Sequence, residues 1–332
     1  MAWRLKLVPD NTKIDFLKYQ VYTFGLSVVL MVASVVILFI NGLNFGIDFR
    51  GGTTIRTEAA QPVDIGEYRA ALNPLDLGDV AITEVFDPGF RADQHVAQIR
   101  IQAQDDGEAM SPETINLALV ALQEVEPSLR FAQIESVGPK VSGELVMTAV
   151  LAVLASLGAM SVYIWLRFEW QYAIGAFISL LHDVLITLGV FSLFQLRFDL
   201  TIIAALLTIL GYSINDTVVV FDRLRENLIK FKSRSLYDLI NLSVNETLSR
   251  TVMTSGTTLL ALVALLILGG DVIRGFVFAI TFGIFIGTYS SIYVAKNIVL
   301  WIGIDRNKDK PEGPDDKAAR RRAGETPFSE MP

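Results

Sequence analysis

The sequence contains no cysteine and only two histidines among its 332 residues. The absence of cysteine excludes disulfide bonds and thiolate metal sites. No second metal-binding side chain stands at ligand spacing from His95, so we interpret it as a surface residue and expect no metal site. Charged residues are also scarce, at 19%, whereas 52% of residues are hydrophobic and the mean hydropathy is +0.46. This balance excludes an ordinary soluble enzyme and indicates a membrane protein with several spans.

Six apolar segments approach the length of about 20 residues that a membrane helix needs. The first, at 21–41, is too long for the apolar core of a signal peptide, and no small-residue cleavage site follows it, so we expect it to be retained. Near the end of the last one, Lys296 is expected to extend its amine toward the aqueous boundary. The sequence therefore predicts a polytopic α-helical membrane protein with six transmembrane helices, the other five lying within 141–301 at 145–166, 171–196, 200–223, 251–268 and 275–300.

The charges are segregated along the chain. Residues 42–140 hold 16 acidic and 7 basic side chains, whereas 223–250 holds 6 basic and 3 acidic ones, and the first 21 residues hold 4 basic and 2 acidic ones. Short basic segments stay in the cytoplasm, and long acidic ones can be translocated. We therefore expect 1–20 and the connection 223–250 inside and the block 42–140 outside. Segment 302–332 reads as a disordered cytoplasmic tail, since 305–332 has balanced charge, four prolines and few apolar residues.

The acidic block 42–140 reads as a small α+β domain between the first two spans. Ser111 and Pro112 form a typical helix start, as the cap and the first-turn proline. The expected order is strand, helix, strand, strand, helix, strand, which is the ferredoxin-like order. The corresponding ranges are 53–57, 65–72, 80–86, 96–103, 112–125 and 131–137.

The segment NGLNFGIDFRGGTT at 41–54 connects the first span to this domain. Its glycines permit a turn with positive φ before the first strand. The residues that we assign to this turn are Gly46, Asp48, Arg50, Gly51 and Gly52.

Asp216 is the acidic residue around which the rest of the chain is organised. About 1.5 Å of rise per residue places it roughly 24 Å along a span that begins near residue 200. A carboxylate at that depth costs about 2.5–3.5 kcal/mol on insertion scales, so it needs a partner or a function. Arg250 is the expected partner, because a capping-box pattern at 243–246 predicts a helix that starts near 243 and brings Arg250 to a matching depth. We interpret Asp216, with the adjacent Asn215, as a proton carrier; the alternative is a static buried ion pair.

Three further features of the spans leave alternatives open. His182 and Asp183 lie halfway along the third span, as relay elements or as an interhelical hydrogen-bonding pair. Asp183 and Asp216 could also be the two carboxylates of an intramembrane aspartyl protease, although their depths differ. The hydroxyls at 251–258 could carry a file of water or bond back to their own helix. Small residues at intervals of four on the last span predict close helix packing, among them Gly283, Gly287 and Ser291.

By its motifs the chain resembles the SecD/SecF family of protein-export membrane proteins, and within it the SecF branch, which shares the architecture of proton-driven exporters of the resistance-nodulation-division superfamily. The resemblance covers nearly the whole chain. The most specific segments are GYSINDTVVVFDRLREN at 211–227 and ETLSRTVMTSGTT at 246–258, supported by LVPDNT at 7–12, GIDFRGG at 46–52, LHD at 181–183 and GTYSSIYVA at 287–295.

The resemblance implies a multi-pass protein of the bacterial inner membrane with both termini in the cytoplasm. It implies that the chain is no enzyme and has no cofactor, and that it uses the proton motive force in late stages of polypeptide translocation. The implied partners are SecD, the SecYEG channel, YajC or YidC, the translocating polypeptide and membrane lipids, with no nucleic acid. It places Asp216 and Arg250 on the proton path, and His182 and Asp183 less directly. The alternative function is a half-unit of a proton-driven small-molecule or lipid exporter.

Overall fold

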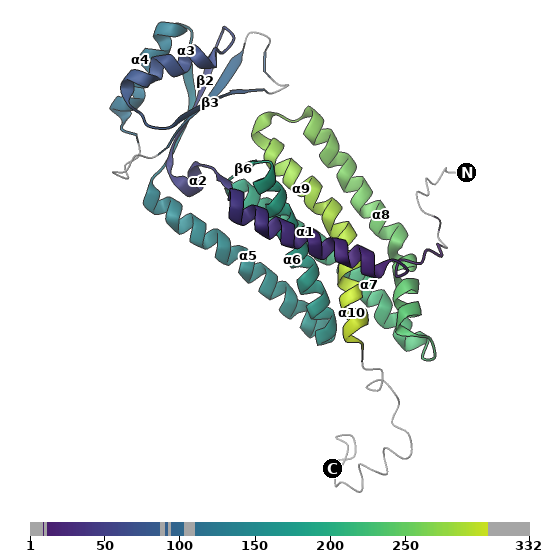
Figure 1. Ribbon diagram of the computed structural model, residues 1–332. Helices are drawn as coiled ribbons and strands as arrows, with labels where there is room; N and C mark the ends of the chain where they lie inside the picture. Colours follow the sequence, from purple (N-terminus) through teal and green to yellow (C-terminus); the bar gives the residue numbers. More distant parts are fainter. Residues whose placement is uncertain (1–8, 10–11, 87–89, 92–93, 103–109, 305–332) are drawn as a thin grey trace, which may run out of the picture.

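The structure is a computed structural model that describes residues 9, 12–86, 90–91, 94–102 and 110–304 (Figure 1). A bundle of long helices makes up most of the molecule, and a small α+β domain sits at one end of it (Figure 1). Residues 1–8 and 10–11 of the N-terminal segment, and the tail from residue 305, lie outside the described residues. The predictions of an N-terminal cytoplasmic segment and a disordered tail therefore stay predictions.

In the described residues, six helical segments are long and apolar enough to cross a membrane. The central one is α6. In its most apolar stretch of 18 residues 61% are buried inside the protein, whereas in the corresponding stretches of α1 and α5 only 11% are buried. The prediction of six spans is confirmed. They are α1 (Gln20–Asn41), α5 (Pro139–Arg167), α6 (Trp170–Leu193), α7 (Leu200–Lys230), α8 (Leu236–Leu268), and a sixth formed by α9 (Asp271–Ser290), the π-helical turn η2 (Ser291–Ala295) and α10 (Lys296–Ile302).

The fifth long helix begins earlier than its sequence predicts. Ser235 caps α8 by accepting a hydrogen bond from the backbone N–H of Asp238. Ser243, the expected cap, is buried inside the helix, and its hydroxyl donates to the carbonyl of Leu239 at 2.7 Å. The Ser-x-x-Glu pattern therefore lies within a helix rather than at its start. The expected connection 223–250 shrinks to five residues, 231–235, because both flanking helices extend into it.

The extramembrane domain has the predicted ferredoxin-like topology. Its four-stranded sheet has the order β3-β4-β2-β5, and all neighbouring strands are antiparallel. The Ser111 hydroxyl accepts from the backbone N–H of Thr114 at 3.1 Å and so caps the second helix, as its sequence predicts. The elements in order are β2 (Gly52–Ala59), α3 (Ile65–Leu72), η1 (Asn73–Leu75), β3 (Val80–Val85), β4 (His95–Gln102), α4 (Pro112–Val125) and β5 (Arg130–Val137).

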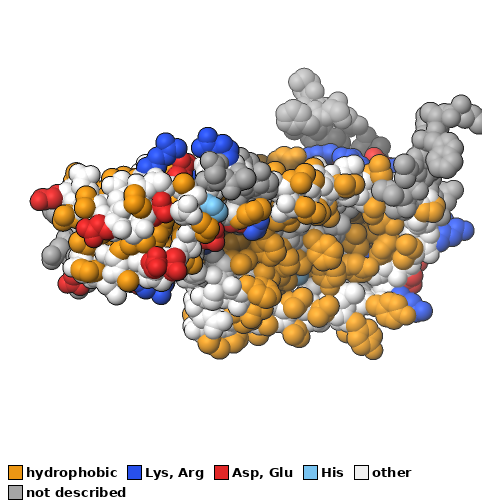
Figure 2. Space-filling model, turned by 90° about the horizontal axis from the view of Figure 1, so that it is seen from above, with side chains coloured by type: hydrophobic (Ala, Val, Ile, Leu, Met, Phe, Trp, Pro, Cys, Tyr) orange, Lys and Arg blue, Asp and Glu red, His pale blue; other side chains and the backbone are white. Residues whose placement is uncertain are grey.

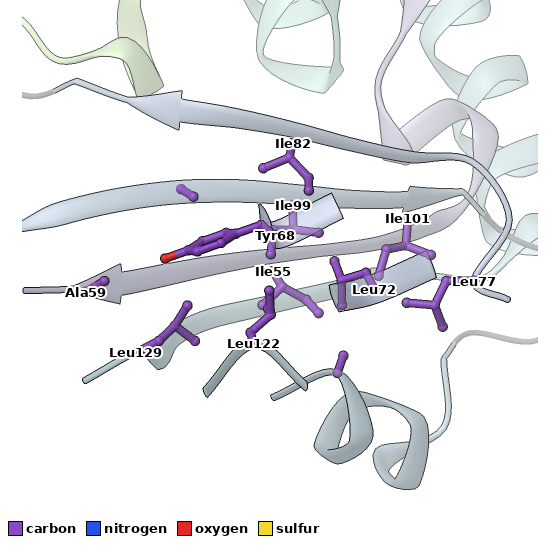
Figure 3. Close-up of a cluster of buried hydrophobic side chains, with 12 residues drawn as sticks. Ile55, Ala59, Tyr68, Leu72, Leu77, Ile82, Ile99, Ile101, Leu122 and Leu129 are labelled. Carbon is purple, nitrogen blue, oxygen red and sulfur yellow. The ribbon is translucent and has the colours of Figure 1, made fainter. Parts of the chain in front are cut away.

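The core of this domain lies between one face of the sheet and the helices α3 and α4. Ile55 and Ile99 project from neighbouring strands toward Tyr68 of α3 and Leu122 of α4, and all four side chains are buried (Figure 3). Because side chains alternate along a strand, the residues between these core positions point out of the opposite face. That second face is directed toward the helical bundle (Figure 1).

The segment after α1 forms a small joint with the α6–α7 loop. The strand β1 (Asn44–Phe45) pairs in parallel with β6 (Arg197–Phe198), and a one-turn helix, α2 (Ile47–Arg50), follows. A parallel pair of two residues on each side leaves no periodic signal in the sequence. The joint ties the base of the domain to the bundle through backbone hydrogen bonds.

The glycines of this joint have two different roles. Gly51 and Gly52 have φ values of 77° and 128°, as expected for a turn with positive φ. Gly46 does not, since its φ is −73°. A side chain there would instead lie 3.3 Å from Asp199 Cβ, and its N–H donates to the carbonyl of Phe198 at 2.8 Å. Gly46 therefore lies where two chain segments pack closely, and a side chain there would require Arg197 or Asp199 to shift by a few tenths of an ångström.

A second contact joins the domain to the far side of the bundle. The backbone N–H of Phe86 donates to Asp271 Oδ2 at 2.6 Å, and the N–H of Asp271 donates to the carbonyl of Phe86 at 3.0 Å. Asp271 begins α9 and also pairs with Arg274. The end of β3 is thus fixed to the start of the last span, which limits the poses that the domain can adopt.

Lys296 does not extend to the aqueous boundary. It is fully buried, with its amine 4.9 Å from the ring centre of Phe16 and 5.3 Å from that of Tyr293. Phe16 is held there because its N–H donates to Asn241 of α8 at 2.9 Å. The prediction was wrong because Phe16, 280 positions earlier in the chain, covers the amine, and no local sequence pattern indicates this contact.

Hydrophobic side chains cover the middle of the bundle on the face shown in Figure 2. Acidic and basic side chains gather on the extramembrane domain and at the opposite end of the bundle (Figure 2). This distribution is that of a protein whose central belt contacts lipid and whose two ends contact water.

Candidate functional site

Two buried aspartates lie at membrane depth on adjacent helices. Asp183 of α6 is 0% exposed and Asp216 of α7 is 3% exposed. At about 1.5 Å per residue, Asp183 lies about 15 Å, and Asp216 about 24 Å, from the helix end nearest the domain. Both side chains are too deep to reach bulk water along their own helix, so each depends on neighbouring helices for partners.

Asp183 accepts hydrogen bonds from three helices. The His182 ring nitrogen Nδ1 lies 2.9 Å from Oδ1. The hydroxyls of Ser213 on α7 and Ser290 on α9 donate to Oδ2 at 2.6 and 2.9 Å. Ser179, one turn earlier on α6, donates to Ser290 at 2.9 Å. We call this set of residues (Ser179, His182, Asp183, Ser213 and Ser290) the Asp183 cluster; it fastens α6, α7 and α9 together.

His182 completes this cluster on the side of α1. Its ring stacks on Tyr289 with 6.1 Å between the ring centres. The Tyr289 hydroxyl in turn donates to the carbonyl of Thr23 at 2.8 Å and receives a hydrogen bond from Ser27 at 3.2 Å. Four helices therefore converge around one carboxylate, and every contact favours a fixed geometry.

Asp216 has far fewer partners. The Ser255 hydroxyl of α8 donates to its Oδ2 at 3.4 Å, which is long for such a bond. Ser255 also lies 2.8 Å from the hydroxyl of Thr288 on α9, and Thr288 donates to the carbonyl of Ile284 at 2.8 Å. Within the described residues no other hydrogen bond and no ion pair reaches the Asp216 carboxyl group. We call Asp216, Ser255 and Thr288 the Asp216 site.

Two residues that the sequence assigned to the proton path lie outside this site. Arg250 forms no ion pair with Asp216 in the part of the chain that the structure describes, and its side chain is exposed on α8, although its charge acts on Asp216. Asn215 is exposed on the outer face of α7. The contact to Asp216 comes from Ser255, five positions after Arg250, because the crossing of α7 and α8 sets the register.

Most hydroxyls of α8 bond to their own helix. Thr254, Thr257 and Thr258 donate to carbonyls three or four positions earlier, at 2.8–3.1 Å. Ser255 is different, because it faces α7 and α9. The sequence does not distinguish Ser255 from the other hydroxyl residues of α8. Ser213 and Ser290 were not predicted as site residues for the same reason. For Ser290 one local signal exists, because it lies three positions after Gly287 of the small-residue stripe; Ser213 and Ser255 have no such signal.

The small residues of α9 lie against α7. A Cβ built on Gly283 would overlap the side chain of Ile209, and one on Gly287 would lie 3.1 Å from Ser213 Cβ and 3.6 Å from Asp183 Oδ2. Ser291 is buried at the start of η2. The absence of side chains at 283 and 287 therefore lets α7 approach closely enough for Ser213 to reach Asp183.

The two carboxylates do not form a shared site. Each is bonded to its own hydroxyls, and no hydrogen bond between them occurs among the described residues. An aspartyl protease needs two carboxyl groups that share one proton. The geometry therefore gives no support to the protease alternative.

Comparison with known proteins agrees with this architecture. The family described as protein export membrane protein SecD/SecF, C-terminal, matches residues 118–305, and the SecD/SecF GG motif matches 36–63. The protein translocase subunit SecF of Cereibacter sphaeroides is 66% identical over 312 residues, covering 94% of this chain and 96% of the relative. That of Rhodobacter capsulatus is 64% identical over 323 residues, covering 96% and 97%. The chain belongs to the SecD/SecF family.

Solved structures of the SecD/SecF family have the same fold. SecDF from Thermus thermophilus, a translocon-associated membrane protein, superposes with a TM-score of 0.77 at 37% identity over 89% of this chain. A second SecDF structure, in a super-membrane-facing form, gives a TM-score of 0.66 at 36% identity over 95% of this chain. The chain spans 39–40% of the length of those SecDF chains.

SecD/SecF membership, with six apolar helices, makes this chain a multi-pass protein of the bacterial inner membrane. It places the chain among the membrane subunits of the protein-export machinery. The GG motif match contains the glycine turn at 46–52, with β1 and α2 of the joint. The alternative of a small-molecule exporter is not favoured by these comparisons.

Proposed function

We propose that this chain couples proton flow to protein export, and that Asp216 is the group that takes up and releases the proton. It would act with SecD next to the SecYEG channel, with YajC or YidC as further neighbours, on polypeptide that emerges outside the membrane. The N-terminus and the short α7–α8 connection would lie in the cytoplasm, since basic residues outnumber acidic ones in 1–21 and 223–250, and six spans would place the C-terminus on the same side. The domain at 42–140 would then lie in the periplasm.

The observation that supports Asp216 is its incomplete hydrogen bonding. A buried carboxyl group normally collects several hydrogen-bond partners, as Asp183 does. Asp216 has one long bond from Ser255 and the more distant charge of Arg250. Neither the ionised nor the neutral form is firmly held, so a small movement of α8 can change which form is preferred.

The hydroxyl pair at this site can serve both forms. When Asp216 is ionised, Ser255 donates to it and can accept from Thr288. When Asp216 is protonated, its own O–H can donate to Ser255, which then donates to Thr288, while Thr288 keeps its bond to Ile284. Each hydroxyl has a single proton, so the direction of this chain of bonds reverses with the charge of Asp216.

The outer face of α7 and α8 indicates where a SecD-type partner would pack. At membrane depth α7 exposes Thr208, Gly211 and Asn215, which share one helix face, and α8 exposes Arg250. The exposed side chains of α1 are instead apolar, for example Val29. An exposed arginine and asparagine are costly in lipid, whereas small and polar residues suit contact with another helix bundle. A partner on this face would also cover Arg250 and bring its charge to bear on Asp216.

The energy available is sufficient for such a device. One charge that crosses a potential of 100 mV yields about 2.3 kcal/mol, which is enough to shift a balance between two conformers by more than tenfold. The Phe86–Asp271 contact and the β1–β6 joint connect the domain to α9 and α7, on which the Asp216 site is built. Movement of these helices would therefore reach the domain.

The proposal is tested by export into membrane vesicles that contain SecD and the SecYEG channel. Asp216→Asn and Arg250→Met are each expected to assemble normally and to abolish the dependence of export on the proton gradient. Asp222→Asn is the matched control, because it removes a carboxylate from the same helix that lies at the exposed end and pairs with Arg167. Full gradient dependence in Asp216→Asn would refute the proposal.

A further inference from the structure

A lysine amine is buried beyond the Asp216 site, on the side away from the extramembrane domain. Lys296 follows Thr288 by eight positions along the last span, which corresponds to about 12 Å. Its side chain is 0% exposed, and its Nζ forms no hydrogen bond and no ion pair with any residue that the structure describes. An ammonium group can donate three hydrogen bonds, so a buried one without an acceptor is costly. This cost indicates a function beyond packing.

Two aromatic rings surround the amine. Its Nζ lies 4.9 Å from the ring centre of Phe16 and 5.3 Å from that of Tyr293. The rings attract a positive charge, whereas burial without an acceptor opposes one. The surroundings therefore hold neither the ammonium nor the neutral amine firmly, and Lys296 can gain and lose a proton.

The charged groups around Lys296 leave it without a counter-ion. Asp15 is the carboxylate whose charge acts on the amine, but it is exposed and its Oδ1 accepts from the Tyr237 hydroxyl at 2.9 Å. The helix α1 has no charged side chain. None of the acidic or basic side chains of α6, α7 and α8 bonds to the amine in the described part of the chain. No fixed partner therefore sets the charge of Lys296.

An apolar cluster separates Lys296 from the Asp216 site. Val220 follows Asp216 by one turn of α7, and Ile292 lies four positions from Thr288 and four from Lys296. These two side chains pack in one buried cluster with residues of α8 and of the segment before α1. We call this cluster, which consists of Phe16, Val220, Val244, Leu248 and Ile292, the inner plug.

The last span departs from a regular α-helix between the two polar sites. Residues Ser291–Ala295 form the π-helical turn η2, which carries both Ile292 of the inner plug and Tyr293 beside the amine. Single π-helical turns within α-helices are frequent at functional sites. The irregular backbone thus lies at the point where a connection between the two sites has to pass.

Phe16 belongs to a segment that side chains hold in place. Residues 12–19 precede α1 and run along α8 (Figure 1). Asn241 accepts from the backbone N–H of Phe16 at 2.9 Å, and Asn245 accepts from the N–H of Ile14 at 2.9 Å and donates to its carbonyl at 2.8 Å. Phe16 can therefore leave the inner plug without breaking a helix or a strand.

We propose that Lys296 exchanges protons between Asp216 and the cytoplasm, and that Phe16 controls its access to water. This inference rests on the proposed function, because it supplies the route by which the proton leaves Asp216. When Phe16 withdraws, water enters between the two groups. The carboxyl O–H bond of Asp216 breaks, the proton passes through water, and an N–H bond forms on the neutral amine. The ammonium then gives the proton to cytoplasmic water and becomes neutral again.

The test compares Lys296→Met with Lys296→Arg in membrane vesicles that contain SecD and the SecYEG channel. Both variants remove the exchange, since methionine has no ionisable group and arginine stays protonated in proteins. Gradient-dependent export is expected to fall about tenfold in both. Arginine keeps the attraction to the two rings, so a purely structural lysine predicts that Lys296→Arg exports as the parent does. That result would overturn the proposal.

Lys230 provides the matched control. Its amine lies 5.1 Å from the ring centre of Phe231, but the side chain is exposed at the end of α7. Lys230→Met and Lys230→Arg are expected to export at the rate of the parent. Lys296→Met is expected to unfold at the temperature of the parent or above, because the buried amine without an acceptor is gone, so that its loss of export is not a loss of fold.

Asp216→Asn in the same assay separates the two proposals. Gradient dependence that survives in Asp216→Asn contradicts the proposed function. If Asp216→Asn loses the dependence while both Lys296 variants export as the parent does, the proposed function stands and the role of Lys296 is refuted.

The role of Phe16 is tested by access to position 296. Because the chain has no cysteine, Lys296→Cys introduces a single thiol. Inverted membrane vesicles expose the cytoplasmic face to a maleimide that does not cross membranes. Phe16→Ala is expected to raise the rate at which this thiol is labelled by about tenfold, since the covering ring is removed. Phe39→Ala, at the opposite end of α1 and exposed, is the control. The same rate with and without Phe16→Ala would overturn the control of access by Phe16.

Discussion

Asp183 and Asp216 lie on neighbouring helices, both almost inaccessible, yet their surroundings differ in kind. Asp183 receives donors from His182, Ser213 and Ser290 at 2.6–2.9 Å, whereas Asp216 has one hydroxyl at 3.4 Å. Burial alone therefore does not indicate function in this bundle. The number and length of the hydrogen bonds distinguish the two groups: those of Asp183 join α6, α7 and α9, whereas Asp216 is the one that we propose changes its charge.

This comparison alters the interpretation of the third span. The sequence assigned His182 and Asp183 to the proton path together with Asp216, and that assignment stays a prediction. The contacts favour the alternative, an interhelical hydrogen-bonding pair. His182 of α6, Ser213 of α7 and Ser290 of α9 all contact the Asp183 carboxyl group. The variants below test the two roles separately.

The largest difference is expected between substitutions at the two aspartates. Asp183→Ala removes the acceptor shared by three buried donors, of which Ser290 keeps its bond to the carbonyl of Gly287, and should lower the free energy of unfolding by about 3 kcal/mol. Asp216→Ala loses one long bond and should cost about 1 kcal/mol. Denaturation of the purified chain in detergent measures both. Equal losses would show that the contrast in hydrogen bonding has no energetic counterpart.

The amide variant of Asp183 gives the matching functional control. In Asp183→Asn the remaining oxygen can still accept from Ser213 and Ser290, and the amide can donate to His182 in its other tautomer. Export should therefore keep its dependence on the proton gradient in Asp183→Asn, unlike Asp216→Asn. Loss of that dependence in both variants would place Asp183 on the proton path after all.

A smaller effect is expected where α9 packs on α7. Gly287→Ala places a methyl group 3.1 Å from Ser213 Cβ and should push Ser213 away from Asp183. Gly211→Ala is the matched control, because a Cβ there meets nothing within 4 Å. Both gain about 1 kcal/mol in helix propensity, so Gly287→Ala should be less stable than Gly211→Ala by about 1–2 kcal/mol. The same free energy of unfolding in both variants would mean that α7 can move away from α9 without loss of stability.

In the complex with a SecD-type partner, Gly211→Ala should weaken association if the partner covers the exposed face of α7 that contains Gly211.

Much of the fold follows from patterns that are local in sequence. The ranges 65–72 and 112–125 were predicted as helices, the second from its capping residue and first-turn proline, and they match α3 and α4. The depth of Asp216 follows from counting residues along one helix. The six spans and the order of the strands were predictable for the same reason, since each depends on about 20 consecutive residues or fewer.

The contacts between helices were not predictable. Ser255 rather than Arg250 contacts Asp216, because the crossing of α7 and α8 sets their register. The crossing angle is not encoded locally in the sequence of either helix. Lys296 is buried because Phe16, far away in the chain, covers it. The joint between β1 and β6 has two residues on each side, too few for any periodic pattern. Tertiary contacts decide all three.

The smallest effect, and the most specific to the proposed proton exchange, is expected at Ser255. Ser255→Ala removes the hydroxyl that can donate to ionised Asp216 or accept from protonated Asp216, so both forms lose a partner and the balance between them changes little. We expect about 1 kcal/mol of lost stability and a several-fold slower gradient-dependent export, with the dependence itself retained. Thr254→Ala is the control, because that hydroxyl bonds only to its own helix. An export rate in Ser255→Ala equal to that of Thr254→Ala would remove the hydroxyl pair from the proposed path and leave Asp216 to exchange its proton by another route.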